Sequence, residues 1–348
     1  MTEADSEPRA GDKTARAANI FDVARLAGVS HQTVSRVINS VPNVRPATRI
    51  RVEQAIAQLR YSPSPAARAL VTKRSRTIGL ITPGAAQYGP TSTAVNFNFA
   101  ARAARFSVDT VSALDSDPAG VRAIVESLLR QRVDAIVLVV ADIAVLEVVL
   151  ALELAIPIVI VAASARRSPA VVSIDQYRGS RAAVRHLIEL GHTDIFHLAG
   201  PPEAPDAIER IRGWHDEIVE NRLPLHDIVH GDWSARSGHE SRSRLPFLTK
   251  GTAVFAGNDY MALGLMSALA EEGLRIPEDV SVVGFDDVPE AAYFSPPLTT
   301  VRQDFAALGG LIMQKVLIAI EDPEDVALSV PMPTSLVVRQ SSAQVSRA

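Results

Sequence analysis

The sequence predicts an α/β protein with a small all-α helix-turn-helix head, followed by a two-lobed core of two parallel, doubly wound sheets. Three observations lead to this prediction. Two short amphipathic stretches flank a tight break between Ile20 and Asn39; apolar runs alternate with amphipathic stretches from Thr77 onward; and 47% of the 348 residues are hydrophobic, enough for a sizeable core. Continuous apolar strands with crossover helices between them are typical of parallel sheets covered on both faces.

The stretch from Ile20 to Asn39 predicts two helices joined by a turn at Gly28. Ser30 is placed to cap the second helix through its hydroxyl oxygen. Helical spacing gives the two helices apolar inner faces made of Ile20, Val23, Leu26, Val34, Val37 and Ile38. Two short helices about a glycine turn, with a polar start to the second, are typical of a helix-turn-helix. An ordinary helical hairpin is the alternative.

A third helix is predicted from Pro46 to about Arg60, because proline is favoured in the first turn of a helix. Its inward residues are predicted to be Ile50, Val52, Ile56 and Leu59. The segment 61–76 is interrupted by prolines at its start and is basic at its end. A helix this short is barely stable in water, so we expect it to order only against a partner. Residues 1–18 are charged, lack periodicity and are predicted to be disordered.

The core is predicted to alternate strands and helices. The predicted strands are Thr77–Pro83, Ser107–Ala113, Ala135–Ala141, Ile158–Ala162, Ile195–Ala199, Ala253–Ala256 and Val280–Phe285. The predicted helices are Val121–Gln131, Val145–Leu154, Arg178–Leu190, Ile208–Asn221, Gly238–Phe247 and Met261–Glu272. About 260 residues are many for one sheet, so we expect two similar lobes with a cleft between them. Polar pairs fall at the carboxyl ends of strands, where open α/β sheets bind ligands: Asp175-Gln176, Pro205-Asp206, Asn258-Asp259 and Asp286-Asp287.

Charge is distributed unevenly along the chain. Residues 1–76 hold 13 Lys or Arg and 6 Asp or Glu, whereas the rest holds 22 and 33, and the net charge is −4. A basic head on an acidic body indicates a polyanion partner at one end only. A solvated basic face is the alternative, but the basic charge coincides with the helix-turn-helix.

The composition also excludes several classes of protein. The sequence has no cysteine, which excludes disulfides and thiolate metal sites and fits a reducing compartment. It begins with charged residues rather than a signal peptide, and no stretch of about 18 apolar residues follows. We therefore expect a soluble, cytoplasmic protein. Glycine loops for phosphate, G-x-S-x-G and H-E-x-x-H are absent, so no enzymatic activity, no metal and no cofactor is predicted.

Several segments carry a family resemblance: DVARLAGVSHQTVSRVIN in the head, ARAL in the linker, HLIELGH at 186–192, GNDYMALG at 257–264 and SVVGFDDVP at 281–289. Through them the chain resembles the LacI/GalR family of bacterial transcription regulators from Ile20 to about Val338. The segments at 231–238 and 296–305 look most similar to its lactose repressor branch. The resemblance implies a DNA-binding head, a hinge helix and a core like a periplasmic sugar-binding protein. A homodimer is expected, because the leucine heptad helix that makes lactose repressor tetramers has no counterpart here.

This resemblance implies the domain boundaries. A tail covers 1–18, the helix-turn-helix domain 19–60, the hinge helix and linker 61–76, the effector-binding core 77–340 and a second tail 341–348. Within the core, the N-lobe is expected at about 77–174 and 304–332, and the C-lobe at about 175–303 and 333–340.

The resemblance further implies which residues contact double-stranded operator DNA. The base-contacting residues are His31, Gln32 and Arg36, and an arginine fork suits guanine O6 and N7. Contacts to phosphates, which position the head, are expected from Ser30, Thr33, Ser35, Asn39, Asn43 and Thr48. In the hinge, Ala67 and Leu70 are expected in the minor groove, with Leu70 as the wedge that kinks a pseudo-palindromic site.

An effector site between the lobes is implied in the same way. The expected residues are Asp206, Arg210, Trp233, Asn258, Asp286 and Gln303. Carboxylates, amides and arginine forks bond sugar hydroxyls, so we expect a small carbohydrate that releases the operator. The structural alternatives are capping roles for Asp286 and Asn258, a core role for Trp233 and a surface ion pair for Arg210. The functional alternatives are a corepressor-dependent repressor that binds a purine or another metabolite, and a stand-alone solute-binding protein.

Three positions at which this sequence departs from the lactose repressor affect which effector and which operator are expected. Ala162 stands where that protein has an aspartate, and Asp206 where it has a serine, so the effector is expected to be a sugar other than a simple galactoside. His31 replaces a tyrosine, so the operator need not be the same. The segment 84–95 is expected to be a loop that forms the other wall of the site, with contributions from Gln87, Tyr88 and Asn96.

Overall fold

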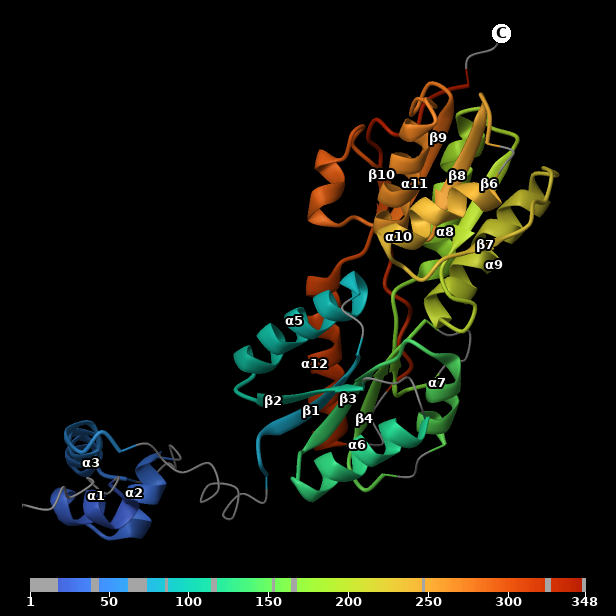
Figure 1. Ribbon diagram of the computed structural model, residues 1–348. Helices are drawn as coiled ribbons and strands as arrows, with labels where there is room; N and C mark the ends of the chain where they lie inside the picture. The colour runs from blue at the N-terminus through green and yellow to red at the C-terminus, as the bar shows by residue number, and fades with distance from the viewer. Residues whose placement is uncertain are drawn as a thin grey trace, which may run out of the picture. The chain divides into compact units, whose positions relative to one another are not determined.

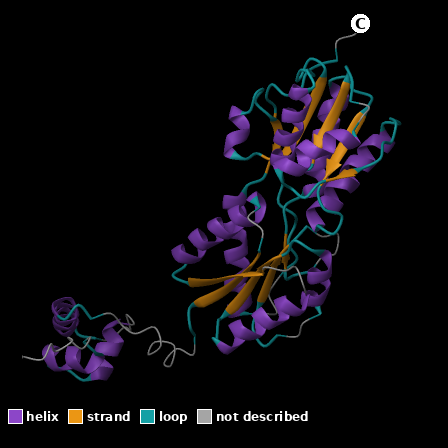
Figure 2. Cartoon of the chain, viewed as in Figure 1, coloured by secondary structure: helices purple, strands orange, loops and turns teal. Residues whose placement is uncertain are grey.

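The computed structural model describes residues 18–38, 44–61, 74–84, 87–113, 118–151, 154–163, 168–245, 248–322 and 327–345 (Figure 1). Contacts divide the chain into two compact units, Met1–Ser75 and Arg76–Ala348. Figure 2 shows that the first unit is helical in its described part, whereas the second contains two sheets flanked by helices. No helix among the described residues is long and apolar enough to cross a membrane.

The head consists of three helices, α1 (Ile20–Ala27), α2 (His31–Ile38) and α3 (Pro46–Gln58). Asn19 caps α1, since its side chain accepts from the backbone of Phe21 and Asp22, and the Asp22 carboxylate accepts from the backbone N of Asn19 at 3.0 Å. Gly28 ends this helix with φ of 61°, a conformation that favours glycine. The predicted cap of α2 is confirmed, because Ser30 Oγ accepts from the backbone N of Thr33 at 3.2 Å.

The inner faces of these helices differ in part from the prediction. Buried residues of the head are Val23, Ala24, Ala27, Val34, Val37, Val52 and Ala55. The predicted inward positions of Leu26 and Ile50 are wrong, because these side chains are 47% and 54% exposed. Alanines occupy their places in the core, and such small side chains let short helices approach closely.

The N-lobe is a parallel sheet with strand order β2-β1-β3-β4-β5. Its strands are β1 (Thr77–Pro83), β2 (Ser107–Ala113), β3 (Ala135–Val139), β4 (Ile158–Val161) and β5 (Val171–Val172). Its helices are α5 (Tyr88–Ala103), α6 (Pro118–Arg130), α7 (Ile143–Leu150) and α12 (Phe305–Glu321). One core contains residues of α5 and α12, and a second contains residues of α6 and α7, so both faces of the sheet are covered.

The C-lobe is a six-stranded sheet with order β11-β10-β9-β8-β6-β7, in which only β11 is antiparallel. Its strands are β6 (Ile195–Ala199), β7 (Val229–His230), β8 (Thr252–Ala256), β9 (Val280–Asp286), β10 (Thr299–Arg302) and β11 (Ser335–Val337). Its helices are α8 (Gln176–Glu189), α9 (Pro205–Glu220), α10 (Ala235–Glu240) and α11 (Asp259–Glu271), with 3-10 turns η1 (Ser241–Arg244) and η2 (Pro289–Tyr293). Helices α8 and α9 share one core, and α11 lies in the other.

Three described segments connect the lobes, and we call them the crossovers: 173–176, 302–305 and 332–335. The first and third run side by side, because the backbone N of Asp175 donates to Met332 O at 2.7 Å and the backbone N of Met332 donates to Ser173 O at 2.9 Å. The second leads from β10 to α12. The carboxyl ends of the strands therefore face a region that is bounded by these segments.

Each predicted strand of the core is present, as is each predicted helix other than 238–247, with ends that shift by a few residues. Two expectations were wrong. The stretch 238–247 is not one helix, because α10 ends at Glu240 and continues as η1. The segment 84–95 is not a loop throughout, because α5 begins at Tyr88. Its polar and small side chains obscure a helical period. Strands β5, β7, β10 and β11 and helix α12 were not predicted.

Close packing of α10 on α11 depends on glycine. A Cβ at Gly264 would overlap the carbonyl oxygen of Ala235, whereas a Cβ at Gly310 in α12 would meet nothing within 4 Å. We expect Gly264→Ala to lower the free energy of unfolding by about 1–3 kcal/mol or more, because the helices must separate. Gly310→Ala should be neutral or stabilise by about 0.4–1 kcal/mol. Urea unfolding of both variants measures this, and equal effects would contradict the packing argument.

Candidate functional site

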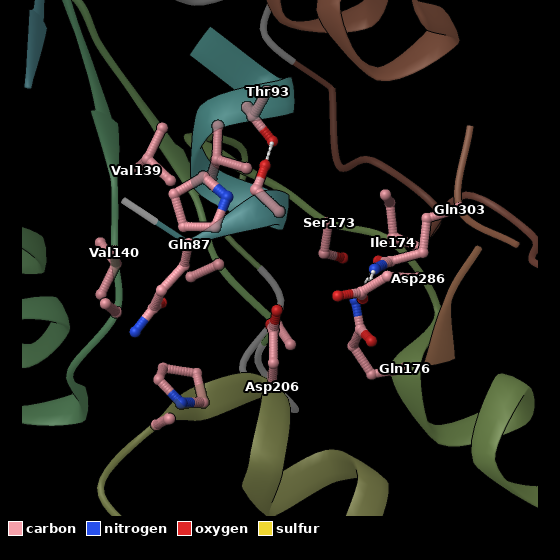
Figure 3. A pocket seen from close by; sticks show the side chains of 18 of the residues that line it. Gln87, Thr93, Val139, Val140, Ser173, Ile174, Gln176, Asp206, Asp286 and Gln303 are labelled. Atoms are coloured by element: carbon pink, nitrogen blue, oxygen red, sulfur yellow. Dashed lines mark hydrogen bonds between the residues drawn. The ribbon is translucent and has the colours of Figure 1, made fainter. Parts of the chain in front are cut away.

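A cleft between the lobes contains about 760 Å³ of space, open to solvent at its mouth (Figure 3). The six side chains predicted for the effector site all line it: Asp206, Arg210, Trp233, Asn258, Asp286 and Gln303. Its walls come from both lobes and from the first two crossovers. The structure thus brings together residues that are nearly 100 positions apart in sequence. Their contact with an effector stays a prediction.

Arg210 lies on α9 and is buried beneath this cleft. Its Nε donates to Gln176 Oε1 at 2.9 Å, its Nη1 donates to the backbone oxygen of Gly257, and its Nη2 lies 3.4 Å from Asp286 Oδ1. The guanidinium also stacks over the ring of Phe285, with its carbon 3.8 Å from the centroid. Each nitrogen of this buried guanidinium therefore has one acceptor, and the surface ion pair considered for Arg210 is wrong.

Asp286 ends β9 and projects into the cleft. Gln303 Nε2 donates to its Oδ1 at 2.7 Å, and Gln176 Nε2 donates to Gln303 Oε1 at 2.8 Å. Burial raises the pKa of Asp286 to about 6, although Arg210 opposes the shift and Asp206 adds to it. The two amides and the carboxylate thus form one chain of hydrogen bonds along the wall of the cleft.

The neighbouring Asp287 points elsewhere. Its carboxylate accepts from Arg302 Nε and from Arg339 Nη2, both at 2.6 Å. The two adjacent aspartates therefore have different cationic partners, and only Asp286 faces the cleft.

Asp206 stands in the first turn of α9, where its carboxylate faces the cleft. Its Oδ2 is 3.8 Å from Arg210 Nη2, and its side chain is 45% exposed to the cleft. Desolvation by the surrounding walls raises its pKa, while Arg210 and the backbone of Ala163 oppose the shift. Two carboxylates therefore face one guanidinium, and Asp206 has the weaker pairing.

Asn258 and Trp233 serve the fold as well as the cleft. Asn258 Oδ1 accepts from the backbone N of Met261 at 2.8 Å and caps α11, so its structural alternative is confirmed. Asn258 Nδ2 donates to the backbone oxygen of Trp233 at 3.0 Å. The Trp233 ring is half-buried against the C-lobe core and approaches Gly200 so closely that a Cβ there would overlap it.

The N-lobe side of the cleft was predicted only in outline. Gln87, Tyr88 and Ala162 line it as expected, but Asn96 does not. Its Nδ2 donates to the backbone oxygen of Ser92 at 2.8 Å, on a groove behind Tyr88. Lining residues that the sequence did not single out on this side are Pro90, Thr93, Val139, Val140, Phe305 and Leu308. Apolar residues at strand ends carry no sequence signal that separates a cleft wall from a core.

In the head, the predicted base-contacting residues all lie on α2, with His31 and Gln32 in its first turn and Arg36 in its last turn. His31, Gln32 and Arg36 are exposed, and their spacing places them on one face of the helix. The hydroxyls of Ser30 and Thr33 lie 3.0 Å apart at the cap. Ser35 and Thr48 are half-buried. The predicted contacts of Asn39, Asn43, Ala67 and Leu70 lie outside the described residues.

Two family models match the chain. Residues 19–64 match bacterial regulatory proteins of the lacI family, and residues 184–342 match a periplasmic binding protein-like domain. The lactose operon repressor of Escherichia coli is 35% identical over 331 residues, covering 93% of this chain and 90% of the relative. The repressor PurR of Vibrio parahaemolyticus is 34% identical, covering 93% and 98%. Catabolite control protein A of Priestia megaterium is 32% identical with the same coverage.

Solved structures of transcription regulators are also similar to this chain. The lac repressor dimer bound to operator and the anti-inducer ONPF has a TM-score of 0.86 at 33% identity, with 94% of this chain and 100% of that chain covered. The complex of the transcriptional regulator CelR with cellobiose has a TM-score of 0.68 at 28% identity, with 93% and 100% covered.

The raised pKa of Asp286 predicts a pH dependence of stability. The folded core binds this proton more tightly than the unfolded chain, where an aspartate titrates near 3.9. Its stabilising contribution is therefore complete below about pH 4 and is lost as pH rises through about 6. Between these limits, the free energy of unfolding of the wild-type protein should fall by up to about 3 kcal/mol relative to that of Asp286→Asn. Urea unfolding of both proteins from pH 4 to pH 7.5 measures the difference, and a difference that is flat or rises with pH would refute the assignment.

Proposed function

Because this chain belongs to the lacI family of bacterial regulatory proteins, we propose that it is a dimeric, cytoplasmic repressor that a small carbohydrate releases from a pseudo-palindromic operator. The family consists of DNA-binding regulators rather than enzymes, and the core of this chain is its periplasmic-binding-protein-like effector domain. The carbohydrate, the dimer and the sign of the response are our proposal.

The observation that carries the carbohydrate is the chemistry of the cleft. A guanidinium, two carboxylates and the Gln303 amide stand in one cleft beside the half-buried ring of Trp233. Such groups pair with the hydroxyls of a sugar, and an aromatic ring packs against its C–H face. The relatives named for lactose and cellobiose support the same class.

A purine corepressor is the second candidate. PurR repressors are about as similar to this chain as the lactose operon repressor is. In that case the bound metabolite would strengthen operator binding rather than release it.

The dimer proposal is supported by apolar side chains that the core leaves exposed. Phe99 is 68% exposed and Val95 is 48% exposed, both on α5 beside a groove over β2. Exposed apolar side chains that gather at one groove are typical of protein interaction surfaces. A dimer also matches the two-fold symmetry of a pseudo-palindrome.

In the proposed mechanism, each head places α2 in a major groove. The effector changes the angle between the lobes and disfavours the DNA-bound form of the protein. Linkage then requires the operator to weaken effector binding by the same factor.

The recognition helix gives the first test. We expect Arg36→Ala to cost about 1–3 kcal/mol of operator binding and to relax one operator position, because a bidentate contact to guanine is lost. Arg51→Ala, another exposed arginine of the head, should weaken all sequences alike or not at all. Selection of sites from a random duplex library, followed by fluorescence anisotropy, measures both. Equal losses on every sequence for Arg36→Ala would show that it contacts only the backbone.

The effector cleft gives the second test. Titration of the protein–operator complex with a panel of saccharides and purine bases should release the operator with a saccharide. Arg210→Lys should weaken that response by about tenfold or more, because the donors of a compact ammonium do not reach the three acceptors that the planar guanidinium spans. The matched control Arg242→Lys alters a partly buried arginine that bonds Leu245 and Glu272 outside the cleft. Stronger operator binding with a purine would establish the corepressor instead.

A further inference from the structure

We propose that the core contacts DNA itself, through four arginines of the N-lobe that bind phosphate groups of the operator. They are Arg76, Arg105, Arg130 and Arg132, and we call them the basic edge. This goes beyond the function proposed above, in which only the heads contact DNA, and it does not depend on the identity of the effector. It rests on the DNA binding of the family and on the place of these charges in the N-lobe sheet.

The basic edge lies where three neighbouring strands begin. Strand β1 runs between β2 and β3 (Figure 1). The backbone N of Ser107 donates to Arg76 O, and the backbone N of Asp134 donates to Thr77 O, both at 2.8 Å. Neighbouring strands are about 4.8 Å apart, so the starts of these three strands lie within roughly 10 Å of one another. The arginines that precede the strands are therefore gathered at one end of the sheet.

Three of the four arginines have a left-handed backbone. The φ angles of Arg76, Arg105 and Arg132 are 53°, 62° and 59°. Arg105 follows α5 and Arg132 follows α6. Glycine, and less often asparagine, is usual at such a position after a helix, because other side chains are strained there. The backbone thus gains nothing from arginine, which indicates a separate role for the side chain.

The guanidinium groups of the basic edge are accessible. All four residues are exposed. Arg105, Arg130 and Arg132 form no ion pair within the part of the chain that the structure describes. The guanidinium of Arg76 packs over the ring of Phe106, with its carbon 5.5 Å from the centroid. Grouped guanidinium forks without carboxylate partners are suited to phosphate oxygens.

The acidic groups at this end of the sheet lie to one side. Asp134 accepts from the backbone N of Arg76 at 2.9 Å. Glu321 and Asp322 stand at the end of α12, which packs on β3 and β4. The acidic charge therefore lies toward β4, whereas the basic charge lies toward β1 and β2.

The chain also enters the core at the basic edge. The second compact unit begins at Arg76, and β1 begins at the next residue. The residues that match the DNA-binding family model, 19–64, precede this point in the same chain. The basic edge is thus the part of the core that follows the head most directly. Arginines there can replace the counterions of phosphates without reading the base sequence.

A structural explanation of these arginines is their attraction to the carbonyl ends of the preceding helices. That explanation holds equally for Arg222, which follows α9 in the C-lobe. Arg222 is also exposed and has a φ of 56°. It therefore matches Arg105 and Arg132 in charge, backbone conformation and position after a helix, and it differs from them in the lobe that it occupies.

The test is the salt dependence of operator affinity for the full-length protein. The operator is selected from a random duplex library, and fluorescence anisotropy is measured from about 0.05 to 0.4 M KCl. In the proposed dimer, Arg105→Gly and Arg132→Gly each remove two phosphate contacts, so each should make the slope of log K against log[KCl] shallower by about 1.8. Affinity should fall by about tenfold or more at about 0.1 M KCl and approach that of the wild type as salt rises.

The variants carry their own controls. Glycine keeps the backbone conformation, and thermal unfolding shows that each variant is folded. Arg222→Gly removes the same charge from the C-lobe and should leave the slope unchanged. Arg132 belongs to β3, across β1 from the groove over β2 that we propose for the dimer, so it tests the basic edge independently of that groove. Sedimentation without DNA shows whether each variant keeps the oligomeric state of the wild type.

Neutral methylphosphonates, placed one at a time along the operator, locate the contact. At one or more phosphates, neutralisation should weaken binding of the wild type by about fivefold or more and leave binding of the double variant Arg105→Gly/Arg132→Gly unchanged. No such phosphate, or an unchanged slope in both single variants, overturns the core contact and leaves the proposed repressor standing. An equal change in Arg222→Gly also overturns it, because the effect is then the long-range field of the core. A library that yields no preferred site overturns this inference and the proposed repressor together.

Discussion

The buried guanidinium of Arg210 is the constraint on which the cleft depends. A charge removed from water must be paired and hydrogen-bonded, and this one takes its acceptors from Gln176, Gly257 and Asp286. These residues lie on a crossover, after β8 and at the end of β9, so one side chain fixes three separate segments. Breaking such a buried pair typically costs about 3–5 kcal/mol. The polar residues around Arg210 are consequently held in position before a ligand binds.

The backbone at the end of β9 is held in an uncommon conformation by a second buried carboxylate. Asp286 and Asp287 have φ of 111° and 53°, conformations that cost roughly 1–3 kcal/mol for residues other than glycine. Behind them, Asp259 is fully buried and accepts from the backbone N of Val288 at 2.8 Å and from Thr300 Oγ1 at 2.5 Å. Burial and the nearby Asp286 raise the pKa of Asp259. The hydrogen bonds of Asp259 hold the adjoining backbone in place, and the side chains of Asp286 and Asp287 point to different partners.

The sequence predicted the parts of the fold that have a strong period and missed those that do not. Buried strands were found because their apolar runs end at polar residues. The six lining residues of the cleft were implied by the family resemblance, and among them the strand ends alone singled out Asp206, Asn258 and Asp286. The prediction that Leu26 and Ile50 face the core of the head was wrong, because alanines occupy the core there. Helix α5 was missed because its side chains are small and polar. No local pattern identifies Gln176 as a partner of Arg210, because that contact exists only once α8 and α9 pack together.

The position of the amides on the crossovers links ligand binding to the angle between the lobes. Gln176 and Gln303 belong to segments that pass from one lobe to the other, and both lie in the bonded chain that ends on Asp286. A rotation of the lobes must be taken up by a few backbone torsions in such segments, which would displace these amides. An effector that bonds these amides therefore shifts the equilibrium between two lobe angles. The size of the shift equals the difference between the free energies of effector binding at the two angles. The apolar side chains of the N-lobe that line the cleft, such as Val140 and Ala162, form no directional bond, so they stabilise any ligand that fills the cleft. The polar residues of the C-lobe and the crossovers determine which lobe angle a ligand favours.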